Sequence, residues 1–342
     1  MHVFLTGATG LVGGALAGAL LDAGHRVTAL VRGMGRDVLD MDGRDRIAEI
    51  AVVQGDVAQP GFGPDSGTSE PPATIDLLVH CAATVDFAAA DRVHQAVNFG
   101  GTAHAIALAQ RWGCPLLYVS TAYVCGRADG LIAESPADPQ ANFTNGYEAS
   151  KARAEALVEA AQADGLSAAI ARPAIIVGRL SDGAIARIDG FHHLFRLFGS
   201  PLLGGVPAVP DAAFAIVPIC HVTAGLLAMA EQHEAFAGQR VHLVGAAPFA
   251  MDDMLRIVGD YPGTMPAHMV DPAHYDPAAL DRRTAMVHRR IGPQFFDYFL
   301  RSPRFETTSL TRTAGIEAPT VDEAAFRRMI DHCIKAGFLD WR

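Results

Sequence analysis

The fold is decided near the N-terminus by Thr6-Gly7-Ala8-Thr9-Gly10-Leu11-Val12-Gly13. This stretch follows the apolar run His2 to Leu5 and leads into a segment with helical character. Glycines at such a junction leave bare backbone N–H groups at a helix N-terminus, which suits the pyrophosphate of a dinucleotide. The spacing is G-x-x-G-x-x-G and differs from the standard G-x-G-x-x-G, so the strand–loop–helix context carries the prediction. We expect a dinucleotide to be bound by Thr6, Gly7, Thr9, Gly10, Leu11, Val12 and Gly13.

Short apolar runs alternate with helical stretches through the first half of the chain. This alternation predicts an α/β fold with a doubly wound parallel sheet of the Rossmann type. Gly24, Gly113 and Gly165 stand where the intervening helices should end, as left-handed C-terminal caps require. The expected strands are His2 to Leu5, Arg26 to Val31, Ala51 to Gln54, Leu77 to His80, Leu116 to Ser120 and Ala168 to Ala171.

The pattern changes twice along the chain. A stretch rich in Gly, Pro and Ser, Gln59 to Thr74, is expected to be an exposed loop insertion. After Gly178 an irregular section, Ser181 to Val217, precedes a strand-like Arg240 to Val244 and a helical tail. We expect a smaller, partly helical C-terminal substrate lobe over the carboxyl edge of the sheet. The predicted domains are 1–178 plus about 219–245 for the cofactor, and about 179–218 and 246–342 for the substrate.

Composition limits the classes of function. The 342 residues are 50% hydrophobic and 19% charged, with a formal net charge of -10. Such a chain buries a sizeable core but lacks the basic surface that a nucleic acid needs. The five cysteines show no metal-ligand spacing, and the N-terminus shows neither a signal peptide nor a membrane span. We therefore expect a soluble cytoplasmic protein with reduced thiols, no metal and no nucleic-acid partner.

The end of the second strand predicts the cofactor. An acidic residue there would bind a ribose 2′-hydroxyl, but this chain has Arg32, about 20 residues beyond the glycine loop. A guanidinium matches a 2′-phosphate through charge-assisted hydrogen bonds, so NADP(H) is favoured over NAD(H). Arg36 is a second candidate. After the third strand, Asp56 and Val57 would lie near the adenine, with Asp56 either accepting from its amino group or serving as a turn residue.

Two residues four apart predict acid–base chemistry. Tyr147 and Lys151 lie in a segment that reads as a helix, Gly146 to Ala163, so their side chains share one face. An ammonium and an oxidised nicotinamide would both favour the phenolate, which moves the pKa of the phenol toward neutrality. Tyr147 would then exchange a proton with a carbonyl oxygen.

Two further positions support this chemistry. Ser120 and Thr121 end the fifth strand at the carboxyl edge, where open parallel sheets bind ligands. Thr121 is the preferred oxygen-orienting donor and Ser120 the alternative. Asn98 precedes Gly100 and Gly101 within a helix, an unfavourable combination that indicates a kink or a water held for proton relay.

Together these motifs resemble the extended short-chain dehydrogenase/reductase superfamily. They are the glycine loop, Gly55-Asp56-Val57, Asn98, VSTAYV at 119–124, Tyr147 with Lys151, and RPAIIVG at 172–178, so the resemblance covers about residues 2–245. The resemblance implies that Thr121, Tyr147 and Lys151 are catalytic, with Asn98 in support. It also places the cofactor beside Cys81, Ala82, Ala83, Tyr147, Lys151, Pro173, Ala174 and Ile176.

Within that superfamily, HCAATVDF at 80–87 and FTNGYEASK at 143–151 are most similar to the fatty acyl-CoA reductase and thioester reductase branch, with its male-sterility-type NAD-binding domain. This resemblance implies NADPH-dependent reduction of a thioester, on coenzyme A or an acyl carrier protein, to an aldehyde and sometimes the alcohol. The chain departs from the branch at Cys220, near which relatives usually carry an aspartate, and in the tail after about Pro248. A homodimer is a further implication of the resemblance.

Other interpretations remain open. A hydroxyl dehydrogenase or epimerase of the nucleotide-sugar, steroid or flavonoid type would use the same catalytic residues, although residues 181–217 offer only Arg187 and Arg196 to bind a diphosphate. A non-catalytic NADP-binding sensor would not need a poised phenol. The aromatic set Phe191, His192, His193, Phe195 and Phe198 either lines an apolar substrate pocket or, at helical spacing, packs as core.

Overall fold

A central sheet of seven parallel strands has the order β12-β7-β5-β4-β1-β2-β3. The computed structural model describes the chain except for residues 34, 64–73, 189 and 342. From β1 the chain builds outward to β2 and β3, then crosses to the other side of β1 and builds outward through β4, β5, β7 and β12. The predicted doubly wound α/β fold is confirmed. Its strands are β1 (His2–Thr6), β2 (Arg26–Val31), β3 (Ala51–Gln54), β4 (Leu77–His80), β5 (Leu116–Val119), β7 (Ala168–Pro173) and β12 (Arg240–Leu243).

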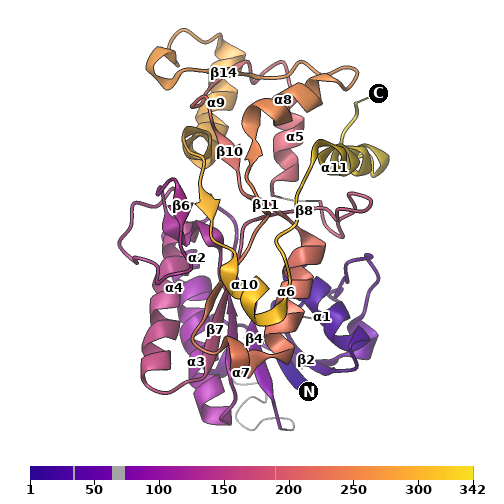
Figure 1. Cartoon of the computed structure of the whole chain (residues 1–342), viewed down its shortest axis with the longest axis vertical. Coiled ribbons are helices and arrows are strands. Elements are labelled where there is room, and N and C mark those ends of the chain that lie inside the picture. The colour runs from indigo at the N-terminus through magenta and orange to yellow at the C-terminus, as the bar shows by residue number, and fades with distance from the viewer. Residues whose placement is uncertain (34, 64–73, 189, 342) are drawn as a thin grey trace.

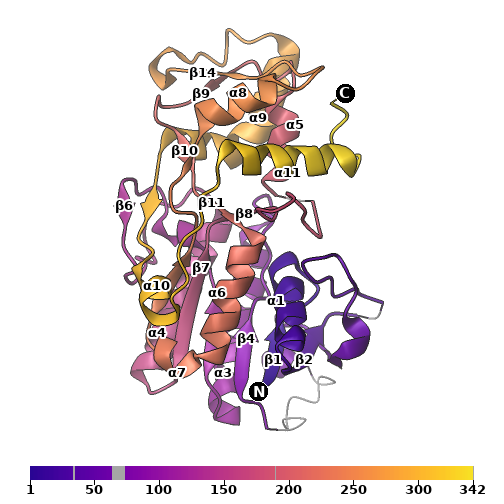
Figure 2. The same ribbon diagram turned by 45° about the vertical axis from the view of Figure 1, so that its right-hand side comes forward.

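Helices cover both faces of the sheet (Figures 1 and 2). Phe4 packs in the core cluster that contains residues of α3 and α4, whereas Val3 and Leu5 pack in the cluster that contains residues of α1 and α6. Successive side chains of a strand point to opposite faces, so both faces of β1 are buried and its sequence is a continuous apolar run. The four helices are α1 (Leu11–Asp22), α3 (Gly101–Trp112), α4 (Gly146–Ala163) and α6 (Ile219–Glu231).

The predicted helix ends are confirmed at three glycines. Gly24, Gly113 and Gly165 have φ angles of 81°, 65° and 100°, and they follow α1, α3 and α4. Only glycine adopts this left-handed backbone without a steric cost, and it lets the chain turn from a helix back into the sheet. Of the predicted loop Gln59 to Thr74, residues 64–73 lie outside the described part of the chain.

A smaller lobe lies above the carboxyl edge of the sheet (Figure 1). The parallel pair β8 and β11 connects the sheet to this lobe. Phe191, His192, Phe195 and Phe198 are buried and pack as core, whereas His193 is exposed, with its ring centre 5.2 Å from that of Phe338. The elements of the lobe and its junction are β8 (Ile175–Val177), α5 (His192–Phe198), β9 (Gly205–Pro207), β10 (Ala213–Phe214), β11 (Ile216–Pro218), β13 (Phe249–Ala250), α8 (Met251–Gly259), β14 (His268–Val270), η5 (Pro272–His274), α9 (Arg282–Phe295), η6 (Phe296–Leu300) and α11 (Glu323–Lys335).

Between the lobe elements η6 and α11, the chain returns to the sheet. β15 pairs in parallel with β6, and α10 then packs near α6 and β12 (Figures 1 and 2). This excursion brings residues near position 300 beside residues near position 130, at the same edge where β5 ends. The remaining elements are η1 (Ile47–Glu49), η2 (Pro60–Phe62), α2 (Asp91–His94), η3 (Gln95–Gly100), η4 (Ala122–Cys125), β6 (Leu131–Ile132), α7 (His233–Phe236), β15 (Arg304–Phe305) and α10 (Thr308–Ala314).

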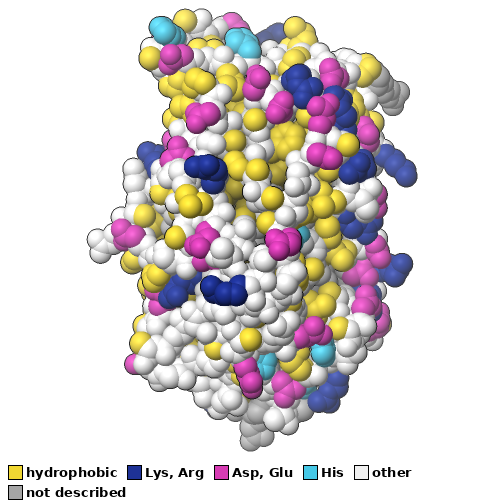
Figure 3. Space-filling model, in the orientation of Figure 1, with side chains coloured by type: hydrophobic (Ala, Val, Ile, Leu, Met, Phe, Trp, Pro, Cys, Tyr) yellow, Lys and Arg dark blue, Asp and Glu magenta, His cyan; other side chains and the backbone are white. Residues whose placement is uncertain are grey.

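The surface gives two further facts. Acidic and basic side chains are interspersed on the face shown in Figure 3, and hydrophobic side chains gather toward its middle and upper part. Among the described residues, no helix combines the length and the apolar character needed to cross a bilayer.

Candidate active site

The glycine loop brings the ends of β1 and β4 into close contact. Gly7 has a φ of +78°, and a Cβ at this position would lie 2.7 Å from Ala82 N and 2.8 Å from the carbonyl carbon of Cys81. A Cβ at Gly13 would lie 2.2 Å from the carbonyl oxygen of Gly7. Thr6 adds to this junction, because its Oγ1 accepts the Ala82 N–H at 3.2 Å. The loop can therefore be formed only with glycine at positions 7 and 13.

This geometry fits a dinucleotide pyrophosphate. The N-cap of α1 is Gly10, which supplies no side-chain hydrogen bond to the first amides of the helix. Thr9, Gly10, Leu11 and Val12 are exposed or half-buried, so these amides face an accessible surface. An uncapped helix N-terminus between two crowded glycines offers N–H donors and a favourable dipole to a phosphate.

The residues predicted around the adenosine are at the ends of β2 and β3. Arg32 and Arg36 are both exposed beyond β2, where a guanidinium can reach a ligand. Asp56 is half-buried, and its Oδ1 accepts the Ala58 N–H at 3.0 Å, as a turn aspartate does. Val57 is buried, and its carbonyl oxygen contacts His104 Nδ1 at 2.8 Å. Asp56 thus has a structural role in the loop in addition to its place beside the predicted adenine site.

Tyr147 and Thr121 meet at the carboxyl edge of the sheet. Tyr147 lies in the first turn of α4, and Thr121 is the N-cap of η4, directly after β5. The Tyr147 hydroxyl lies near the side chain of Thr121, which acts to lower the pKa of the phenol. Ser120 is buried, and its amide donates to Ala171 O at 2.7 Å. This geometry favours Thr121 over Ser120 as the partner of the tyrosine.

Lys151 lies one helical turn below Tyr147 and reaches the same strand end. Its Nζ donates to Val119 O at 2.7 Å and lies 4.2 Å from the centre of the Tyr118 ring. Burial lowers the pKa of Lys151 to about 7, and the nearby Glu155 carboxylate acts in the opposite direction. The ammonium is therefore held beside β5 by a carbonyl oxygen and an aromatic ring.

The predicted acidity of Tyr147 depends on a bound oxidised nicotinamide and stays a prediction, because the protein's own residues act in the opposite direction. Burial raises the pKa of the phenol above its ordinary value, and Thr121 only partly counteracts this shift. Desolvation disfavours the phenolate because a buried charge loses its hydration. Lys151 does not offset this effect, since its ammonium is directed to Val119 and Tyr118. The phenol is consequently protonated at neutral pH.

Asn98 lies in the predicted helix irregularity, which the structure confirms as the π-helical turn η3. Its Oδ1 accepts the Thr84 N–H at 2.8 Å, and its Nδ2 donates to Thr84 O at 3.1 Å and to Ser150 Oγ at 2.9 Å. Ser150 Oγ in turn donates to Tyr147 O at 2.7 Å. The amide of Asn98 thus connects the loop after β4 to the turn of α4 that carries Tyr147.

The remaining predicted cofactor residues lie along the same edge. Cys81, Ala82 and Ala83 follow β4 and are half-buried. Pro173 ends β7, the Ala174 N–H donates to Leu243 O at 3.1 Å, and Ile176 lies in β8. These residues border the open carboxyl ends of the strands on either side of β5, where doubly wound sheets bind ligands.

A buried ion pair holds α4 one turn beyond Lys151. Arg172 Nε and Nη2 donate to the two carboxylate oxygens of Glu155 at 3.0 and 2.6 Å. Both side chains are at most 3% exposed. Glu155 lies one turn beyond Lys151 on α4, so this bidentate pair fixes the helix against β7.

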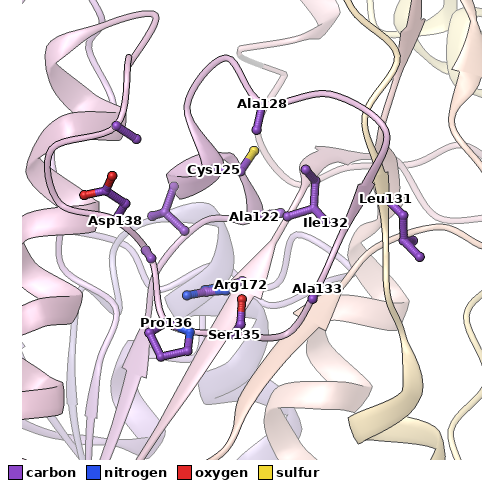
Figure 4. A pocket seen from close by; sticks show the side chains of 13 residues that line it. Ala122, Cys125, Ala128, Leu131, Ile132, Ala133, Ser135, Pro136, Asp138 and Arg172 are labelled. Carbon is purple, nitrogen blue, oxygen red and sulfur yellow. The ribbon is translucent and has the colours of Figure 1, made fainter.

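A cavity of about 240 Å³ lies beside η4 (Figure 4). Its wall is mostly apolar and includes Ala122, Ile132 and Pro136, with Arg172 at its base. The guanidinium of Arg172 is already paired with Glu155, so it offers no free charge to a ligand. The volume is below the roughly 300–1,000 Å³ of most small-molecule sites.

A group of residues that the sequence did not predict contacts the first turn of α4. Glu148, which follows Tyr147, is fully buried and accepts a hydrogen bond from Tyr298 at 2.5 Å. Arg301 lies 3.6 Å from the same carboxylate oxygen. The available signal was a charged residue at the end of an aromatic run, Phe295 to Arg301, because a buried arginine needs a partner.

The glycine cradle, the edge of the sheet and the Thr–Tyr–Lys set define a class of protein. The chain has the fold of the extended short-chain dehydrogenases/reductases and carries an NAD(P)-binding domain. The family described as male sterility protein matches residues 5–225, and the chain belongs to this family. The match confirms the resemblance to the fatty acyl-CoA reductase and thioester reductase branch.

Known proteins similar to this chain include parts of peptide synthetases. Peramine synthetase A of Epichloe festucae (strain Fl1) is 31% identical over 226 residues, which are 60% of this chain and 8% of that protein. The chain spans less than half the length of the curated relatives it matches.

Two solved structures share the fold over nearly the whole chain, including the tail after about Pro248. The terminal R domain from the myxalamid PKS-NRPS biosynthetic pathway has a TM-score of 0.82 at 24% identity, covering 99% of this chain and 92% of that one. A thiolation-reductase di-domain from an archaeal non-ribosomal peptide synthetase has a TM-score of 0.75 at 20% identity, covering 98% of this chain and 76% of that one.

Proposed function

We propose that this chain reduces the carbonyl carbon of an acyl thioester with NADPH, releasing a thiol and an aldehyde. The observation that carries the proposal is that the side chains of Thr121 and Tyr147 meet at the carboxyl edge of the sheet. Two hydroxyl groups at one point can hold one carbonyl oxygen, which is the requirement for reducing a carbonyl compound. The similarity to reductase domains of peptide synthetases supports a thioester as the source of that carbonyl.

The proposed preference for NADPH depends on Arg32. This arginine is exposed beyond β2, where its planar fork of donors matches a 2′-phosphate. Arg36 adds a second positive charge four residues further on. In the proposed complex, the pyrophosphate lies against Gly7, Gly10 and Gly13, at the N-terminus of α1.

The chain's own residues then perform the proton chemistry. When bound, NADPH supplies the hydride that reaches the carbonyl carbon. Thr121 orients the carbonyl oxygen, and Tyr147 donates its proton to that oxygen. Burial raises the pKa of Tyr147, so the phenol is protonated before the reaction and carries the proton that it donates. The resulting hemithioacetal carries the added hydride and proton, and it separates into the aldehyde and the free thiol.

The substrate class is tested by cofactor oxidation. Purified protein is mixed with NADPH or NADH and with acyl thioesters of coenzyme A or N-acetylcysteamine, of several chain lengths, alongside the matching aldehydes. We expect thioester-dependent loss of NADPH, and further loss with the aldehydes would extend the reaction to the alcohol. Oxidation with aldehydes or ketones only would replace the proposal with a carbonyl reductase or dehydrogenase.

A pair of neighbouring variants tests the role of Thr121. Thr121→Val removes the hydroxyl that lies near the Tyr147 side chain. We expect kcat to fall about a hundredfold, as for the loss of one oxyanion donor. Ser120→Ala removes the adjacent hydroxyl and is the matched control, with activity near that of the wild type. Equal losses in the two variants would contradict the assignment.

A further inference from the structure

A segment of the C-terminal lobe reaches the first turn of the catalytic helix. Tyr298, in η6, donates from its hydroxyl to Glu148 Oε1 at 2.5 Å and accepts from Asn145 Nδ2 at 3.0 Å. Glu148 is fully buried, and Tyr298 is only 7% exposed. Tyr298 therefore binds α4 at the residue that follows Tyr147 and at the N-cap residue of the helix.

Glu148 connects this contact to the geometry of the helix end. Its backbone N–H donates to the side chain of the N-cap Asn145 at 3.0 Å, and its Oε2 accepts the Thr144 N–H at 3.0 Å. This reciprocal arrangement fixes the backbone on both sides of the cap. Tyr147 lies between Asn145 and Glu148, so the position of its backbone is set by the same hydrogen bonds.

Arg301 completes the cluster. Its Nη2 lies 3.6 Å from Glu148 Oε1, its Nη1 donates to Gly126 O, and its guanidinium lies 4.9 Å from the centre of the Tyr298 ring. Arg301 is 3% exposed. A buried carboxylate needs a buried partner of opposite charge, and here the partner comes from the C-terminal lobe.

Phe87 provides a second connection to the catalytic tyrosine. Its ring centre lies 5.8 Å from that of Tyr147 and 6.4 Å from that of Tyr298, with the second pair stacked. Tyr298 thus acts on Tyr147 along two routes, one through the backbone at Glu148 and one through the ring of Phe87. A side chain held along two routes has little freedom to leave Thr121.

We propose that Tyr298 and Arg301 are positioning residues that, through Glu148 and Phe87, fix the hydroxyl of Tyr147 beside Thr121. This inference rests on the proposed function, and it makes the C-terminal lobe part of the proton-transfer machinery. The lobe must be docked on α4 for the tyrosine to be placed for reaction.

The cofactor site does not depend on this cluster. Deeper turns of α4 are held by Ser150 with Asn98, by Lys151 with Val119 and by Glu155 with Arg172. Loss of the Tyr298 hydroxyl leaves all three contacts in place. We therefore expect kcat to fall while the affinity for the cofactor is unchanged, a division that general unfolding would not produce.

The test compares two tyrosines of the same lobe. Tyr298→Phe removes the hydroxyl that binds Glu148, whereas Tyr275→Phe removes one that binds His288 Nδ1 at 2.6 Å and is the matched control. We expect Tyr298→Phe to lower kcat about ten- to a hundredfold, as a small displacement of a catalytic group does. Its Kd for NADPH should stay within twofold of the wild type. A kcat equal to that of Tyr275→Phe would overturn the inference.

A measurement that needs no turnover tests the positioning role of Tyr298 independently of the proposed substrate. The protein has six tyrosines, so fluorine NMR of protein labelled with 3-fluorotyrosine gives few resonances, and Tyr147→Phe identifies that of Tyr147. We expect Tyr298→Phe and Glu148→Gln to shift this resonance and Tyr275→Phe to leave it unchanged. A Tyr147 resonance with the same chemical shift in Tyr298→Phe as in the wild type would refute the positioning role, whatever the substrate. Shifts without thioester reduction by the wild type would refute only the proposed substrate.

Discussion

The sheet half and the C-terminal lobe contribute to the site in different ways. In the sheet half, backbone geometry and helical spacing form the site. Gly7 and Gly13 shape the loop, and α4 carries Tyr147 and Lys151 one turn apart beside the end of β5. The lobe contributes single side chains, Tyr298 and Arg301, that cross about 150 residues of sequence to reach Glu148. Local spacing therefore builds the sheet half of the site, whereas tertiary contacts add the side chains of the C-terminal lobe.

The largest expected effect distinguishes a buried ion pair of the sheet half from an exposed ion pair of the lobe. Arg172→Met leaves Glu155 buried without its partner, and we expect the free energy of unfolding to fall by about 3–5 kcal/mol. Arg256 and Glu323, in the lobe, also meet at 2.6 Å, but they are 50% and 44% exposed. Arg256→Met should therefore change stability little, because water screens the pair. Urea denaturation measures the free energy of unfolding of both variants. Similar losses in the two would contradict the expected difference between the buried and the exposed pair.

The next effect concerns the cofactor end of the sheet. Arg32→Ala removes the proposed partner of the 2′-phosphate, so we expect KM for NADPH to rise about ten- to a hundredfold, from the loss of roughly 1.5–3 kcal/mol of charged hydrogen bonding. KM for NADH should be unchanged. Arg26→Ala, at the opposite end of β2, is the control. A parallel rise for both cofactors would mean that Arg32 does not select between them.

A smaller effect separates two glycines of positive φ. Gly7 and Gly24 have φ angles of +78° and +81°, but a Cβ at Gly24 would meet nothing within 4 Å. We expect Gly24→Ala to lose about 1–2 kcal/mol of stability from the left-handed backbone alone, and Gly7→Ala to lose more, because its Cβ would also collide with the backbone of Cys81 and Ala82. Only Gly7→Ala should also weaken NADPH binding, measured by cofactor fluorescence, because its Cβ would meet Ala82. Equal affinities in the two variants would contradict the close approach of the loops.

A last effect is a dependence of stability on pH. Burial lowers the pKa of Lys151 to about 7, so between pH 7 and the higher pKa of the unfolded chain the folded state binds fewer protons. Stability from this group rises as pH increases through that window, by about 1 kcal/mol per pH unit. Lys151→Met should lack this contribution. Urea denaturation at pH 7, 8 and 9 compares the two slopes, and identical slopes would exclude a lowered pKa.

The same comparison explains what the sequence can predict. The strands, the capping glycines and the pairing of Tyr147 with Lys151 follow from periodicity, backbone geometry and helical spacing, which are local properties. The contact of Tyr298 with Glu148 depends on how a distant lobe docks, and no local pattern records it. The effect of burial on the pKa of Tyr147 could not be predicted for a related reason, since burial is a property of the packed molecule.

The most direct test of the central claim is thioester-dependent oxidation of NADPH by the wild type and by Tyr147→Phe, measured together with the Kd of each for NADPH. We predict that the wild type oxidises NADPH when an acyl thioester is added, and that Tyr147→Phe binds NADPH normally but turns over about a thousandfold more slowly. Undiminished activity in Tyr147→Phe would contradict the account, because the proton would then come from another group.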